Sequence, residues 1–293
     1  MERTNPSRYV LIYFGAILCF ALSGAFVKYS ALGPCATAFY RMLFSIPLLL
    51  PFVWQALPAL SRRDILLLLG GGLLLGMNLA LWNYGLVCTS QANANLLGNL
   101  HIFATVPLSL LFYQEKIRRA YLLGVAVAMI GLALLIFGKA DPRAGYFLGD
   151  GAAFLSALFY GGYMMVTYAV RDRVSAWAAI WVSAFGCLIF LFPAMALLEG
   201  LQFPDTWPRL WPILMIMLAG QFGGIGLMSL ALGRIRATLG SLLSLTQPVA
   251  GALLGFILFS ERLTGQEIIG MLICSAGVYL AQRRGPEAPR PQA

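Results

Sequence analysis

The segment QANANLLGNLH, residues 91–101, carries an unusual density of amide and imidazole side chains within a long apolar stretch. Its polar members are Gln91, Asn93, Asn95, Asn99 and His101. Each of these groups needs hydrogen bonds, because burying a polar group without a partner costs roughly 2–7 kcal/mol. Neutral donors and acceptors gathered in this way suit a zwitterionic solute, so the segment is a candidate binding site.

Aromatic residues form a second candidate group. Asn78 and Trp82 are four residues apart and therefore share one face of a helix, and Tyr160 and Tyr163 share a face beside Gly161. Rings around a cavity suit an aromatic or apolar solute. Aromatic residues near a membrane interface also serve as anchors, so lining and anchoring roles both stay open for these rings.

The carboxylates are informative by their positions. All 11 Asp and Glu residues fall at the ends of apolar segments, in connections or in the tails. A proton-driven exporter needs a buried ionisable relay, so this pattern predicts facilitated transport. His101 is the one alternative, since its unperturbed pKa of about 6.5 would let it carry protons; we expect it to act as a neutral hydrogen-bonding group.

Two cations lie within apolar segments. Lys28 lies near the end of its segment, where it either snorkels to the head groups or faces a vestibule and attracts a carboxylate. Arg41 lies about two turns into its segment, so it needs a partner or must snorkel, and we expect a structural role for it.

Enzyme chemistry has little support. The five cysteines include no C-x-x-C pair, the chain has one histidine, and no glycine-rich loop follows a strand. We therefore expect no catalytic residues, no metal and no cofactor.

The elements that must position these side chains are membrane-spanning helices. Hydrophobic residues make up 60% of the 293 residues, charged residues make up 11%, and the mean hydropathy is +0.82. About 20 apolar residues in a helix cross the hydrocarbon layer. We predict an all-α integral membrane protein with ten transmembrane helices, at 9–30, 35–56, 64–87, 91–112, 119–138, 147–169, 175–198, 210–232, 237–259 and 266–283.

The basic residues predict the orientation. With the N-terminus inside and ten spans, fourteen Lys and Arg residues lie in inner segments and four in outer loops. This bias predicts that both termini are cytoplasmic. The net charge of +9 is spread over six separate segments, so we expect no nucleic-acid partner.

The two halves of the chain resemble each other. An offset of 146 residues places 109–132 on 255–278, with Gly124 on Gly270 and Gly131 on Gly277. The same offset extends over residues 91–101. Five spans per half is an odd number, so the second half must be inverted, as in many secondary transporters. We predict repeats at 1–140 and 141–284, followed by a disordered tail at 285–293.

These motifs carry a family resemblance. The pattern NYGLVCTSQANANLLGNL, followed by SLLFYQEK, and its counterpart ATLGSLLSLTQPVAGALLGFILFSERLTGQEIIG resemble the drug/metabolite transporter superfamily, EamA type. The resemblance covers nearly the whole chain, and residues 82–101 look most like the YddG-type exporters of aromatic amino acids. It implies export of amino acids or similar metabolites through a central cavity lined by several spans.

The prediction is therefore a monomeric exporter of amino acids, aromatic and other neutral ones, in the bacterial inner membrane, with lipid around it and alternating access about a central cavity. The alternative is an exporter of drugs or of other small metabolites such as nucleosides. The predicted substrate-binding residues are Asn78, Trp82, Asn95, Asn99, His101, Tyr160, Tyr163, Ser244 and Gln247.

Overall fold

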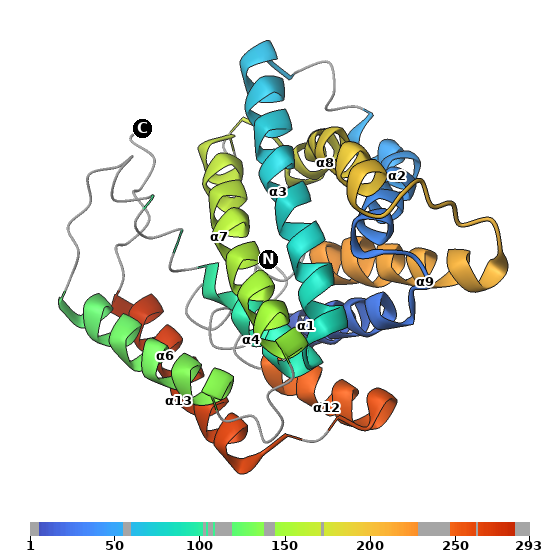
Figure 1. The fold of residues 1–293 in the computed structure, drawn as a ribbon. Helices are drawn as coiled ribbons and strands as arrows, with labels where there is room; N and C mark the ends of the chain where they lie inside the picture. The colour runs from blue at the N-terminus through green and yellow to red at the C-terminus, as the bar shows by residue number, and fades with distance from the viewer. Residues whose placement is uncertain are drawn as a thin grey trace.

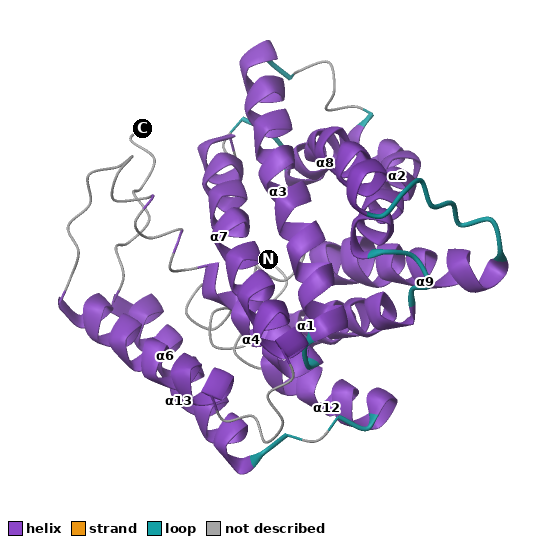
Figure 2. Cartoon of the chain, in the orientation of Figure 1, coloured by secondary structure: helices purple, strands orange, loops and turns teal. Residues whose placement is uncertain are grey.

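The structure is a computed structural model that describes residues 6–54, 60–101, 104, 108, 119–137, 144–170, 173–227, 247–261 and 263–284. Within those ranges every regular element is a helix and no strand occurs (Figure 2). The prediction of an all-helical fold is therefore confirmed for the described part of the chain.

The helices follow the expected apolar segments. Their bounds are α1 Pro6–Tyr29, α2 Pro34–Val53, α3 Arg62–Cys88, α4 Gln91–Gly98 with the 3-10 turn η2 Asn99–His101, α6 Arg119–Phe137, α7 Ala144–Val170, α8 Ala176–Leu198, α9 Trp207–Met217 with the π-helix η3 Leu218–Gly226, α12 Gln247–Phe259 and α13 Gly265–Arg284. Among the described residues, four segments are long and apolar enough to cross a membrane: Leu11–Tyr29, Pro34–Val53, Arg62–Cys88 and Ala176–Leu198. The number of crossings stays a prediction.

Local sequence explains where several helices begin. Ser61, Ser90 and Ser175 are N-caps whose hydroxyls accept from the backbone N–H three residues later, which satisfies one of the free donors of the first turn. Pro34 occupies the first position of α2, where its missing N–H costs nothing.

Two expected spans depart from a regular α-helix. The segment that starts at Gln91 changes from α to 3-10 geometry at Asn99. In the remainder of this expected span, 102–112, only residues 104 and 108 are described. The eighth span begins as α9 and widens into the π-helix η3, which contains four glycines. π-Helical turns are rare and often occur at functional sites.

Helices α6 and α13 pack closely as a pair, visible at the lower left of Figure 1. A Cβ added at Gly131 would overlap the backbone of Cys274, and one added at Gly277 would overlap the backbone of Ala128. The offset of 146 that aligns the two halves converts one of these contacts into the other. The two helices run antiparallel, because Gly131 of α6 meets Cys274 of α13, whereas the earlier residue Ala128 meets the later residue Gly277.

The other helices show a matching exchange of neighbours. Helix α1 packs against α9, η3 and α12, whereas α7 packs against α3 and α4 (Figure 1). In the sequence repeat, α1 corresponds to α7, the α9–η3 span to α3, and α12 to α4. The first helix of each half therefore packs against helices of the other half.

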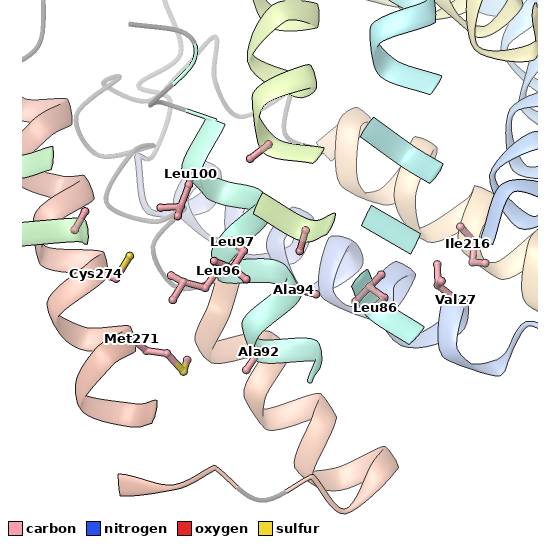
Figure 3. Packing of buried hydrophobic residues seen from close by; sticks show 13 residues of the cluster. Val27, Leu86, Ala92, Ala94, Leu96, Leu97, Leu100, Ile216, Met271 and Cys274 are labelled. Atoms are coloured by element: carbon pink, nitrogen blue, oxygen red, sulfur yellow. The ribbon is translucent and has the colours of Figure 1, made fainter. Parts of the chain in front are cut away.

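The main apolar core gathers residues from both halves around α4. Leu96, Leu97 and Leu100 are buried there, with Ile216 from α9 and Met271 from α13 in the same cluster (Figure 3). Because α4 lies inside this cluster, its polar side chains are held among protein neighbours.

Candidate functional site

Three of the predicted site residues form an aromatic cluster at the contact of η2 with α7. The rings of Tyr160 and Tyr163 have centroids 6.0 Å apart. The His101 ring meets Tyr160 edge to face, with centroids 5.2 Å apart and planes at 87°. The edge-to-face arrangement of His101 and Tyr160 is one that aromatic pairs prefer.

Asn78 joins this cluster from α3. Its Nδ2 donates to the backbone carbonyl of Ser156 at 3.0 Å. Ser156 lies one turn before Tyr160, and its own hydroxyl donates to the carbonyl of Ala153 at 2.7 Å. Because one amide proton of Asn78 is engaged with α7, this side chain fixes α3 to α7.

Trp82 lies one turn after Asn78, with its indole between two glycines. A Cβ added at Gly98 would lie 3.3 Å from the Cδ1 and Nε1 atoms of Trp82, and one at Gly24 would lie 3.6 Å from Cη2. The indole therefore occupies the space that glycine leaves on both α1 and α4. Trp82 and Asn78 both lie on α3, four residues apart, and a lining role for either stays a prediction.

Asn95 and Asn99 point elsewhere. The Nδ2 of Asn99 donates to the carbonyl of Asn95 at 2.8 Å, which is a contact within its own helix. Asn95 is buried against Gly251 of α12, and neither polar atom of its side chain has a partner among the described residues. The structure thus separates these two residues from the aromatic cluster.

Two further polar residues of the 91–101 segment serve packing. Gln91 donates from Nε2 to the carbonyl of Ala21 at 2.6 Å, which joins α4 to α1. Asn93 is fully buried. The polar side chains of this segment therefore meet different neighbours rather than a single cavity.

The remaining two predicted residues add little to the site. Gln247 is half-buried at the first position of α12. Ser244 lies outside the described residues.

Sequence reasoning gave too little weight to a polar group around Arg41. The guanidinium is buried on α2, and a Cβ added at Gly220 would lie 3.3 Å from its Nη2 atom and 2.9 Å from the hydroxyl of Ser23. Snorkelling, one of the two explanations offered for this residue, is therefore wrong. A lone arginine two turns inside an apolar segment was the signal that could have identified it.

The sequence of the whole chain matches one family model twice. The description of that model is "EamA-like transporter family", and the matches cover residues 7–137 and 147–282. The chain belongs to the EamA-like transporter family. The resemblance to the drug/metabolite transporter superfamily is confirmed by these two matches.

Curated relatives have low sequence identity to this chain but align over most of its length. A "Probable amino-acid metabolite efflux pump" of Salmonella typhimurium is 28% identical over 64% of this chain and 66% of its own length. An "Uncharacterized transporter" of Archaeoglobus fulgidus is 26% identical over 93% of this chain and 95% of its own. The "Pseudopaline exporter CntI" of Pseudomonas aeruginosa is 26% identical over 72% of this chain and 75% of its own.

A solved crystal structure has the same fold. The two chains superpose with a TM-score of 0.63 at 18% identity, over 94% of this chain and 97% of the other. This EamA-type chain is therefore a multi-pass membrane transporter with a two-repeat architecture, and its substrate is a small molecule.

Proposed function

We propose that this EamA-type transporter exports amino acids, with aromatic ones preferred, across the bacterial inner membrane by alternating access. The cluster of Tyr160, Tyr163 and His101, with Asn78 bound to the helix that carries both tyrosines, supports the proposal. Aromatic faces suit the solute side chain, and neutral polar groups suit a zwitterion that must be released again. The names of the relatives in Salmonella typhimurium and Pseudomonas aeruginosa, an efflux pump and an exporter, support export.

The packing supports an inverted repeat of ten spans, divided at 1–140 and 141–284. The contact of Gly131 with Cys274 and that of Gly277 with Ala128 are reciprocal and antiparallel, as a two-fold axis in the membrane plane requires. Two arrangements of nearly equal energy then arise by exchanging the roles of the halves. An even number of spans and the inner bias of basic residues support cytoplasmic termini.

Facilitated transport follows from the positions of the acids. Every described carboxylate lies in a connection or within the first two turns of a helix, and each binds another group. His101 is the member of that cluster whose unperturbed pKa lies near neutral pH, and its ring contacts Tyr160. The chain is proposed to act as a monomer.

Counterflow in proteoliposomes tests the function. Vesicles loaded with phenylalanine should accumulate labelled phenylalanine, tyrosine and leucine with or without a proton gradient. The His101→Gln variant should keep this exchange, because it retains a neutral hydrogen-bonding side chain. No exchange of any amino acid would reject the substrate class, and strict dependence on the gradient would reject facilitated transport. Exchange of nucleosides or cationic drugs instead would support the alternative substrates.

A further inference from the structure

Arg41 is a buried cation for which the described structure offers no counter-ion. Arg41 is 6% exposed, and its Nε and Nη1 atoms have no hydrogen-bond partner among the described residues. It lies seven residues after the first residue of α2, so it is about 10 Å into the helix. An ionisable group at such a depth is costly and usually marks a substrate path.

The carboxylates of the described residues are engaged elsewhere. The six in the described residues bind other partners: Asp64 binds Arg173, Asp150 binds Thr89, Glu199 binds the start of α2, Asp205 binds Arg209, Glu261 binds Lys28 and Glu267 binds Thr264. The other five lie outside both the described residues and the spans predicted from the sequence. A counter-ion from the protein is therefore not available at Arg41 within the described structure.

The surroundings of the guanidinium suit an anion. Because Gly220 has no side chain, the Nη2 atom of Arg41 lies close to η3, and the hydroxyl of Ser23, which donates to the carbonyl of Ile216 at 3.4 Å, borders the same glycine. Gln221 is buried beside it, with its Nε2 atom 3.5 Å from the sulfur of Met42 and its Oε1 atom without a partner in the described residues. Three helices, α1, α2 and η3, thus bring polar groups to one place.

This group lies next to the aromatic cluster. Met42, the neighbour of Arg41 in sequence, packs in one buried cluster with Tyr163 and Cys187, and Tyr160 packs against that cluster. Gln221, next to Gly220, contacts the sulfur of Met42 at 3.5 Å, so it links the surroundings of Arg41 to the cluster that holds the aromatic rings.

We propose that Arg41 binds the carboxylate of the transported solute, with Ser23 and Gln221 as neutral neighbours. The inference rests on the proposed function and narrows it: the substrates are carboxylate-bearing metabolites, and their amides are poor substrates. A guanidinium binds a carboxylate through two parallel charge-assisted hydrogen bonds, which a neutral amide cannot reproduce.

The assignment is tested by comparing the affinities of purified wild-type protein for acids and for the corresponding amides. The pairs are phenylalanine with phenylalaninamide and phenylacetate with phenylacetamide. Wild type should bind each acid roughly tenfold or more tightly than its amide, the range expected for a charge-assisted hydrogen bond. Arg41→Gln should bring both ratios close to one, and Arg41→Lys should give intermediate ratios. The matched control Arg209→Gln removes an exposed arginine and should keep the wild-type ratios.

The outcomes separate the two proposals. A wild type without preference for the acids, or a folded Arg41→Gln variant with unchanged ratios, overturns the inference even if amino acids are exported. If Arg41→Gln does not fold, Arg41→Lys and Gly220→Ala decide, and wild-type ratios in both overturn it. Ratios that depend on Arg41 in a protein that exchanges no amino acid would support the carboxylate site and reject amino-acid export.

Discussion

The ammonium of Lys28, at the end of α1, forms an ion pair with the carboxylate of Glu261, which follows α12. The same carboxylate accepts from the backbone N–H of Gln91 at 3.0 Å, and Lys28 also donates to the carbonyl of Thr89 at 3.0 Å. The ends of α1, α3, α4 and α12 are therefore joined by one pair of charges. In this conformation the ammonium of Lys28 is bound by the protein, so it neither extends to the lipid head groups nor is available to a substrate carboxylate.

Breaking this pair should destabilise the protein. The side chains are only 13% and 19% exposed, so removing one partner leaves a poorly solvated charge. We expect Lys28→Met or Glu261→Gln to lower the free energy of unfolding by about 2 kcal/mol, between the values for exposed and buried pairs. Thermal unfolding in detergent measures it. The exposed pair Asp205–Arg209 is the control, and Asp205→Asn should change stability by less than about 0.5 kcal/mol.

The ion pair between Lys28 and Glu261 should also influence transport if the joined ends of α1, α3, α4 and α12 must separate during the transport cycle. Charge exchange, Lys28→Glu with Glu261→Lys, should recover part of the stability lost in either single variant, but not the hydrogen bonds to Thr89 and Gln91. An exchange variant no more stable than the single variants would show that the charges themselves contribute nothing.

The reciprocal glycines of α6 and α13 should respond alike. Gly131→Ala and Gly277→Ala each place a methyl group against backbone of the facing helix, so each should cost about 1–3 kcal/mol or more. Unfolding of the two purified variants can be compared directly. Gly151→Ala, with open space around its Cβ position, should cause no loss, because alanine favours a helix. Unequal effects at 131 and 277 would contradict a symmetric contact.

Trp82 should affect selectivity more than stability. Trp82→Leu removes the indole between Gly24 and Gly98, and we expect binding of aromatic amino acids to weaken about two- to tenfold relative to leucine. Competition for labelled substrate in proteoliposomes measures the ratio. Trp207, 68% exposed at the start of α9, provides the control, and Trp207→Leu should keep the wild-type selectivity. Equal weakening for leucine would assign Trp82 to packing alone.

Glu199 should stabilise the N-terminus of α2 across a loop. Its two oxygens accept from the backbone N–H groups of Cys35 at 2.7 Å and Ala36 at 2.9 Å. A carboxylate at this end of a helix interacts favourably with the unpaired donors and the helix dipole. Glu199→Gln should therefore cost about 1 kcal/mol of stability, measured by thermal unfolding with Asp205→Asn as the control. A stability equal to wild type would remove the capping role.

Much of the fold could be predicted from the sequence because it depends on local patterns. Apolar length located the helices, and a fixed offset related Gly131 to Gly277 before any contact was known. The faces shared by Asn78 with Trp82 and by Tyr160 with Tyr163 follow from helical periodicity alone. The number of membrane crossings and the inversion of the second half stay predictions.

The partners of the polar groups were decided only by tertiary structure. The bond of Gln91 to Ala21, the pairing of Lys28 with Glu261 and the closeness of Arg41 to Gly220 join residues that are far apart in the sequence. Helical periodicity gives the direction of a side chain on its own helix, but not the helix that faces it. The sequence by itself therefore determined that polar groups of 91–101 needed protein neighbours, and packing between the two halves determined which neighbours they received.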